Sequence, residues 1–159
     1  MSDPNHIHNW QRLDERTTTS GQPSEAELAE LAAMGARHVI DLALHSHARA
    51  LPDEAASVAA LGMTYTHIPV AFDRPSEADY ERFCAVLGAL GEAPRHVHCI
   101  LNFRVSAFFY RYRRDLLGWD ERQARAAMEA LWQPGGVWAA FIGDTDGIAL
   151  PHRPPRAEP

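Results

Sequence analysis

Short apolar runs alternate with helical segments along this chain, and this alternation limits the folds it can adopt. β-Branched and apolar residues predict buried strands at 38–44 and 64–70, with a third around Val97. Segments with helical apolar spacing, each opened by a capping residue, separate these strands. Strands joined through helices are typical of a parallel sheet with both faces covered. We therefore expect an α/β fold of three layers, in which a mostly parallel central sheet of four to five strands is flanked by helices.

The flanking elements complete this prediction. Trp10–Leu13 and Arg16–Thr19 predict a short hairpin, and Ser24 with Glu27 predicts a capping box at the start of the first helix. Helices are expected at about 24–34, 53–61, 76–90, 106–117 and 120–132.

The length of 159 residues fits a single domain, which we place at 10–150. Residues 1–9 carry little apolar patterning and predict a flexible N-terminal arm. Residues 151–159 predict a loose proline-rich tail.

Charge and cysteine content exclude several classes of protein. The formal net charge is −6, and all 15 basic residues are arginine. An acidic chain lacks the dense positive surface that nucleic acids and anionic membranes require, so neither is expected as a partner. Cys84 and Cys99 are too few for a disulfide framework, and the first residues lack the basic and apolar stretches of a secretory signal. We expect a cytoplasmic protein with reduced thiols.

Cys99 carries the main chemical prediction. It follows the predicted strand around Val97, Arg104 lies five positions on, and a helix is expected to start near Ser106. A helix N-terminus and a guanidinium both favour negative charge, so they would hold an oxyanion and stabilise a thiolate. Asn102 lies mid-loop, where we expect a left-handed backbone conformation that asparagine tolerates. The alternative is a small buried cysteine with a structural role, which is our interpretation of Cys84.

The segment His98–Ser106 resembles the signature loop of cysteine-dependent protein tyrosine and dual-specificity phosphatases. It is most similar to the bacterial phosphatase-like domain that also occurs in β-lactamase-hydrolase-like proteins. Three further stretches support the resemblance, namely Ser20–Ser24, Val39–Leu42 and Tyr65–Val70. The resemblance covers about residues 13–132.

The resemblance implies hydrolysis of a phosphomonoester, such as protein phosphotyrosine, through a phosphocysteine. Cys99 would be the nucleophile and Arg104 would hold the oxyanion, while Ser106 would donate to the thiolate. Asp73 would be the general acid, although turn chemistry alone also explains an aspartate there. His98 would orient the loop through hydrogen bonds. The implied phosphate-binding residues are Ile100, Leu101, Asn102, Phe103, Arg104 and Val105.

The loop also departs from the phosphatase pattern. Four residues separate Cys99 from Arg104, where the phosphatases have five, and Asn102 replaces the customary glycine. The shorter spacing also occurs in rhodanese-like sulfurtransferases, in which the cysteine carries a persulfide. A sulfurtransferase is therefore one alternative, and a non-catalytic module that binds phosphate or sulfate is another.

The sequence predicts neither a cofactor nor a metal ion. Nine histidines are present, but no zinc-type cysteine or His-Glu spacing accompanies them. The expected partner is a phosphorylated small molecule or protein. Trp119, Trp132, Trp138 and Phe141 are expected either to complete the core or to form the seam of a homodimer.

Overall fold

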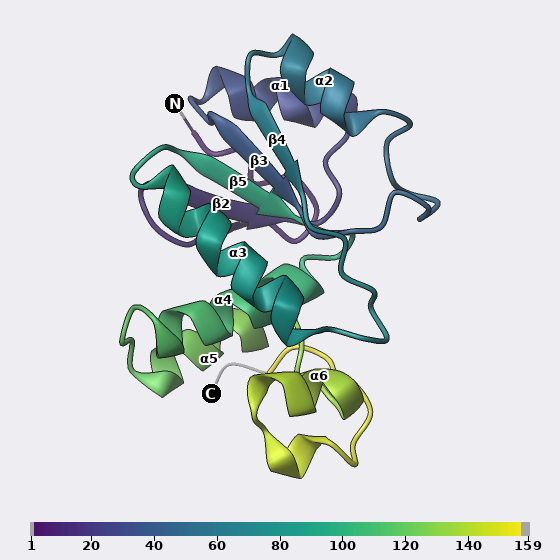
Figure 1. Ribbon diagram of the computed structural model, residues 1–159, viewed down its shortest axis with the longest axis vertical. Coiled ribbons are helices and arrows are strands. Elements are labelled where there is room, and N and C mark those ends of the chain that lie inside the picture. Colours follow the sequence, from purple (N-terminus) through teal and green to yellow (C-terminus); the bar gives the residue numbers. More distant parts are fainter. Residues whose placement is uncertain (1, 157–159) are drawn as a thin grey trace.

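A five-stranded sheet lies at the centre of the computed structural model, which describes residues 2–156 (Figure 1). The strands are β1 (Gln11–Arg12), β2 (Thr17–Ser20), β3 (His38–Asp41), β4 (Thr64–His67) and β5 (Arg95–His98). Their order is β1-β2-β5-β3-β4, and every pair is parallel except the β1–β2 hairpin. The predicted α/β fold with a mostly parallel sheet is confirmed.

Helices cover both faces of the sheet. They are α1 (Glu25–Ala33), α2 (Glu54–Ala60), α3 (Glu77–Leu90), α4 (Phe103–Asp115), α5 (Glu121–Glu129) and α6 (Gly136–Ile142), followed by the 3₁₀ turn η1 (Thr145–Gly147). Helices α1 and α2 pack on one face, and α3 to α6 gather on the other side (Figure 1). Ser24 and Glu27 form the predicted capping box, and the side chains of Asp53 and Ser76 cap α2 and α3.

The alternation of side chains along β3 divides the core into two clusters. Val39 packs with Leu28, Leu31 and Val58 under α1 and α2. Its neighbour Ile40 belongs to the larger cluster on the opposite face. Both residues are fully buried, as expected for a strand inside a parallel sheet that is covered on both faces.

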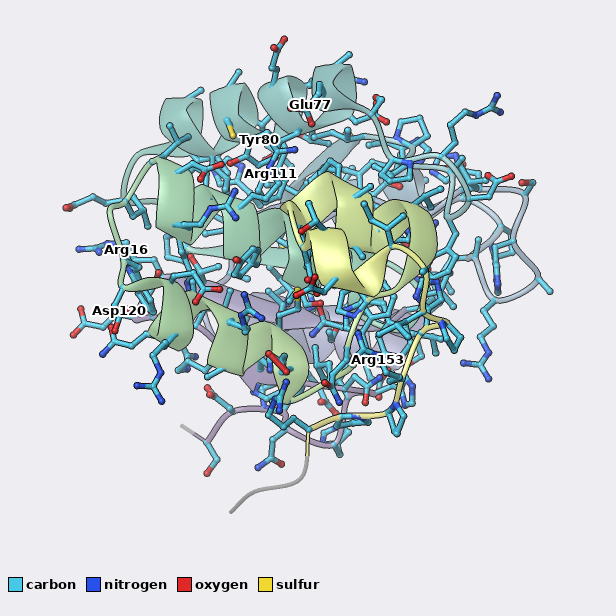
Figure 2. The ribbon with its side chains drawn as sticks, turned by 90° about the horizontal axis from the view of Figure 1, so that it is seen from below. Arg16, Glu77, Tyr80, Arg111, Asp120 and Arg153 are labelled. Atoms are coloured by element: carbon cyan, nitrogen blue, oxygen red, sulfur yellow. The ribbon has the colours of Figure 1, made fainter. Side chains whose placement is uncertain are left out.

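An ion pair and a stacked ring join α3 to α4. The Arg111 guanidinium lies 3.9 Å from the centre of the Tyr80 ring and pairs with Glu77 (Figure 2). These contacts fix α3 against the helix that begins at the cysteine loop.

The two terminal segments pack against the domain, where a flexible arm and a loose tail were expected. Ile7 is 1% exposed because it packs against the cluster under α1. Near the other end, Gln133 and Arg153 form a β-bridge, and Arg156 pairs with Glu129. The last residues of the expected tail, 157–159, lie outside the described part of the chain. Within residues 2–156, no helix has the length and hydropathy needed to cross a bilayer.

Candidate active site

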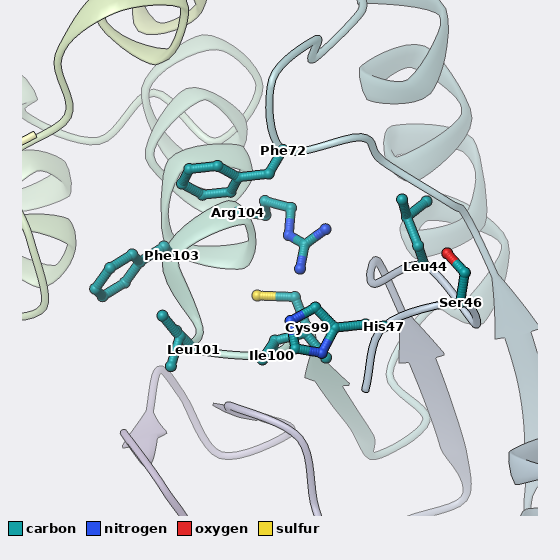
Figure 3. A pocket seen from close by; sticks show the side chains of 9 residues that line it. All are labelled: Leu44, Ser46, His47, Phe72, Cys99, Ile100, Leu101, Phe103 and Arg104. Atoms are coloured by element: carbon teal, nitrogen blue, oxygen red, sulfur yellow. The ribbon is translucent and has the colours of Figure 1, made fainter. Parts of the chain in front are cut away.

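Cys99 lies at the carboxyl edge of the sheet, immediately after β5. It opens into a cavity of about 360 Å³ that Arg104 also lines. The Arg104 guanidinium lies over the Cys99 side chain at this cavity (Figure 3). Ligands of parallel α/β sheets bind at this edge, so the position agrees with the sequence prediction.

Asn102 turns the loop directly into α4. Its φ of 68° lies in the left-handed region, which confirms the predicted conformation. Helix α4 begins at Phe103, three residues earlier than expected, because the single left-handed residue is enough to redirect the chain. Arg104 therefore lies in the first turn of α4 and not in the loop. There the backbone of the helix holds it more rigidly.

The backbone of the cysteine loop leaves three of its amide groups without an acceptor within residues 2–156. The carbonyls of residues 99, 100 and 101 accept hydrogen bonds from His98 Nδ1 (3.0 Å), the Gln22 amide (3.0 Å) and Asn9 Nδ2 (2.8 Å), respectively. In a planar trans peptide the N–H points away from its carbonyl, so the amides of residues 100–102 face the opposite side. These three amides find no acceptor within residues 2–156. Consecutive amides without acceptors are the arrangement that anion-binding loops share.

Arg104 is oriented for an anion as well. It is buried, and its Nη1 donates to the Val70 carbonyl at 2.8 Å. Its guanidinium lies 5.7 Å from the centre of the Phe72 ring. No carboxylate within residues 2–156 pairs with it, so its remaining N–H groups are available to a ligand.

The other predicted phosphate-binding residues divide into two groups. The side chains of Ile100, Leu101 and Phe103 line the cavity with Arg104. Those of Asn102 and Val105 are fully buried away from it. Asn102 instead donates to the Asn9 carbonyl and to Thr19 Oγ1, at 2.8 and 3.0 Å, and so anchors the loop.

His98 forms a buried ion pair beneath the loop. Its Nε2 lies 2.5 Å from Glu54 Oε2, and its Nδ1 lies 3.7 Å from Asp41 Oδ1. Burial alone would lower the pKa of His98, but the charges of Asp41 and Glu54 outweigh it and raise the pKa to about 10. His98 is therefore an imidazolium that donates to the Cys99 carbonyl. Such a hydrogen bond could orient the loop, and that role stays a prediction.

Ser106 differs from its predicted arrangement. Its hydroxyl donates to the Phe103 carbonyl at 2.7 Å and accepts a hydrogen bond from Trp132 Nε1 at 2.8 Å. The predicted hydrogen bond from Ser106 to the Cys99 sulfur is not found among residues 2–156. The early start of α4 explains the difference, because Ser106 belongs to the first turn of the helix and bonds back to it.

Asp73 does not reach the cavity. It is exposed and lines a separate hollow with Arg111 and Phe141, although its neighbour Phe72 lines the cavity of Cys99. Its role as a general acid therefore stays a prediction.

Two polar residues that the sequence analysis did not select, Ser46 and His47, line the cavity. They follow β3, so the rule that ligands bind beyond the carboxyl ends of strands could have found them. The Arg49 amide donates to His47 Nδ1 at 3.0 Å, which leaves Nε2 to carry the proton of the neutral ring.

Two groups of side chains have the composition of metal ligands. Asp41, Glu54 and His98 form the ion pair described above, and Asp41 also lies with His45 and His67. The rings of His45 and His67 stack with centres 3.7 Å apart and planes 7° apart, so their in-plane lone pairs do not converge. Hydrogen bonds already occupy His45 Nε2 and His67 Nε2. The geometry therefore does not suit a metal ion.

Gly21 allows the β2–α1 turn to reach the cysteine loop. A Cβ atom at Gly21 would overlap the Ile100 carbonyl oxygen, which is a backbone atom held in the loop. We expect Gly21→Ala to destabilise the protein by about 1–3 kcal/mol in urea denaturation and to disturb anion binding. Gly88→Ala, at an exposed position in the last turn of α3 with nothing near its Cβ, is the control and should stabilise the protein by roughly 0.5 kcal/mol. Equal stability of the two variants would contradict the close approach of Gly21 to the Ile100 carbonyl.

The comparisons with known proteins place the chain in a family. No family model matches the sequence, and no curated protein matches it. A solved structure described as a "putative phosphatase (DUF442)" from Shewanella putrefaciens CN-32 is 30% identical with a TM-score of 0.77, over 88% of this chain and 92% of that chain. A second structure of the same description is 32% identical with a TM-score of 0.70, over 76% and 78%. The chain belongs to the DUF442 family.

More distant structures share the fold of this DUF442 protein. TpbA of P. aeruginosa, solved in complex with phosphotyrosine, is 22% identical with a TM-score of 0.65, over 93% of this chain and 82% of that chain. The predicted resemblance to cysteine-dependent tyrosine and dual-specificity phosphatases is thereby confirmed for the fold.

Proposed function

We propose that this DUF442 protein is a cysteine-dependent phosphatase that acts on phosphomonoesters. One observation carries the proposal: Cys99 and Arg104 line a single cavity, beside loop amides that have no acceptor within residues 2–156. A phosphoryl group needs a nucleophile on one side and donors for its equatorial oxygens, and these groups supply both. The description of the Shewanella relatives as a "putative phosphatase" supports the proposal.

The reaction would proceed in two displacements. The Cys99 thiolate attacks phosphorus, the S–P bond forms, and the P–O bond to the leaving alcohol breaks with a proton transferred to that oxygen. Water then attacks the phosphocysteine and releases inorganic phosphate and the thiolate. Arg104 and the loop amides hold the equatorial oxygens throughout. Leu44, Phe72 and Leu101 surround the cavity with apolar side chains, which suits an aromatic leaving group.

Hydrolysis of an aryl phosphate tests this proposal. We expect Arg104→Lys to lower kcat/KM about 10²-fold, because an ammonium cannot reproduce the two-pronged contact of a guanidinium with two oxygens. Arg122→Lys, at an exposed position on α5, is the control and should retain activity. A wild-type protein without activity, or an Arg104→Lys variant with full activity, would refute the proposed chemistry.

A sulfurtransferase is the second candidate, and two observations favour it. Only four residues separate Cys99 from Arg104, and no carboxylate lines the cavity among residues 2–156. Attack of the thiolate on the outer sulfur of thiosulfate breaks the S–S bond and releases sulfite with its electron pair. Sulfite leaves as an anion, so no general acid is needed. Cyanide would then take the outer sulfur of the persulfide as thiocyanate.

Asp73→Asn separates the two candidates. It should depress the hydrolysis of an alkyl phosphate if Asp73 is the acid, and it should leave thiocyanate formation unchanged. Phosphate binding without either turnover, retained in Cys99→Ser and weakened in Arg104→Ala, would instead indicate a non-catalytic anion-binding module.

A further inference from the structure

Three of the 15 arginines are buried, and none of the three has an acidic partner. Arg95, Arg104 and Arg113 are 8%, 6% and 5% exposed. Buried charges are normally paired, yet no carboxylate oxygen of residues 2–156 lies within 4.0 Å of any of these guanidiniums. Arg104 is the anion clamp of the cysteine loop. The other two arginines line a second cavity, of about 170 Å³.

This second cavity lies at the amino edge of the sheet, opposite Cys99. Arg95 is the first residue of β5, whereas Cys99 follows its last residue. Arg113 lies in the last turn of α4, whereas Arg104 lies in its first turn. Arg16, which also lines the cavity, lies at the margin of the molecule (Figure 2). The site is therefore separate from the active site and open to solvent.

Backbone carbonyls hold both buried guanidiniums and leave most of their N–H groups free. Arg95 donates to the carbonyls of Ala93 and Gly91, and Arg113 donates to the Leu13 carbonyl at 3.0 Å. Trp119 supports the Arg113 guanidinium from 4.1 Å. A guanidinium has five N–H groups, and within residues 2–156 no further hydrogen bond engages either side chain. Both side chains are thus oriented before any ligand binds.

The local charge favours an anion even though the whole chain is acidic. Arg16 pairs with Glu92 at 3.4 Å, and Asp14 lines the cavity with its Oδ1 accepting from the Arg16 amide. Burial lowers the pKa of Arg95 and of Arg113, while the charge of Asp14 opposes this in both. Asp14 and Glu92 set two negative charges against the three positive charges of Arg16, Arg95 and Arg113.

We propose that this cavity binds a phosphate-type or sulfate-type oxyanion between Arg95 and Arg113. Both guanidiniums line the same cavity, and each has N–H groups left to donate to the oxygens of a tetrahedral anion. Leu87, Phe109 and Leu117 form apolar walls, so the group could be free or carried on an apolar body. The competing interpretation is that the two arginines only bind the backbone carbonyls.

Calorimetric titration with sodium phosphate tests the proposal on the Arg104→Met protein, in which the active-site clamp is absent. We expect Arg113→Met to weaken phosphate binding about tenfold or more, since charge-assisted hydrogen bonds contribute on that scale. Arg122→Met removes one charge at an exposed position and should change nothing. Parallel titrations with sodium sulfate and phenyl phosphate distinguish a free anion from one on an apolar body.

Asp14→Asn should change the affinity for phosphate in the direction opposite to Arg113→Met. The variant should fold, because the asparagine Oδ1 can still accept from the Arg16 amide. We expect phosphate to bind roughly threefold more tightly at low ionic strength, with the gain lost at high salt. Phosphate bound at the active site should protect Cys99 from an alkylating reagent. In proteins that keep Arg104, this protection should be the same with and without Arg113→Met or Asp14→Asn. Binding that is insensitive to Arg113→Met and Asp14→Asn would overturn the proposal.

Discussion

Replacing Cys99 by serine is expected to lower turnover on the order of 10⁴-fold, as in other enzymes that lose their nucleophile. Within residues 2–156, no carboxylate lines the cavity to activate a serine hydroxyl, and His47 Nδ1 already accepts from the Arg49 amide. The thiol lies close to Arg104 and to the N-terminus of α4. A thiol is intrinsically nucleophilic, whereas a hydroxyl needs a base to activate it. In the proposed reaction Arg104 and the loop amides hold the phosphoryl oxygens, so we expect inorganic phosphate still to bind to Cys99→Ser.

Steady-state hydrolysis of an aryl phosphate and phosphate titration measure the two effects separately. Cys84→Ser is the matched control, because Cys84 is the other free cysteine and lies half-buried on α3, away from the cavity. It should keep full activity. Loss of activity in both variants to the same extent would mean that the thiol at position 99 is not the nucleophile.

Glu54→Gln is expected to cost about 3 kcal/mol of stability near pH 6.5. The Glu54 carboxylate is buried, and it accepts hydrogen bonds from His98 Nε2 and from Gln22 Nε2. A neutral amide leaves the imidazolium with Asp41 as its remaining carboxylate, 3.7 Å away. Breaking one side of a buried ion pair is costly because the other charge stays in a medium of low polarity.

The free energy of unfolding should decrease as the pH rises from 7 to 10. The folded-state pKa of His98 is raised from 6.5 to about 10, so its contribution is complete below pH 6.5 and is lost as the pH rises through 10. The pKa of Glu54 is lowered because the charge of His98 and its hydrogen bonds outweigh the opposing effect of burial, so the Glu54 contribution is lost only in acid. Wild-type stability in urea should therefore fall by a few kcal/mol between pH 7 and pH 10.

The same urea series on Glu54→Gln checks the assignment. Its stability should depend less on pH over that interval, whereas Glu81→Gln, at an exposed position on α3, should follow the wild type. A wild-type curve that is flat between pH 7 and pH 10 would show that His98 is neutral in the folded protein.

Local sequence signals predicted most of the sheet and the central part of the site. Capping residues such as Ser24 and Ser76 act within one helical turn, so their effect can be read from adjacent positions. Cys99 could be placed because it follows a buried strand in a parallel sheet, and Asn102 because few residues accept a left-handed conformation.

The missing parts of the site depend on contacts between distant positions. Glu54 and His98 are 44 residues apart, and Asn9 and Leu101 are 92 apart. No periodicity or capping rule relates such pairs, since the folded chain alone brings them together. The start of α4 was misplaced for a related reason: the hydrophobic pattern marks the middle of a helix better than its first turn.

The bond from Asn9 to the Leu101 carbonyl has a practical consequence. Residues 7–9 look dispensable in an alignment of strands and helices, and they are an obvious place to trim the chain or attach a purification tag. Yet Asn9 and Asn102 each donate a side-chain amide hydrogen to the other's loop, and Ile7 fastens the segment to the core. A protein truncated before Trp10 would lose these contacts, so measurements made on it would describe an altered cysteine loop.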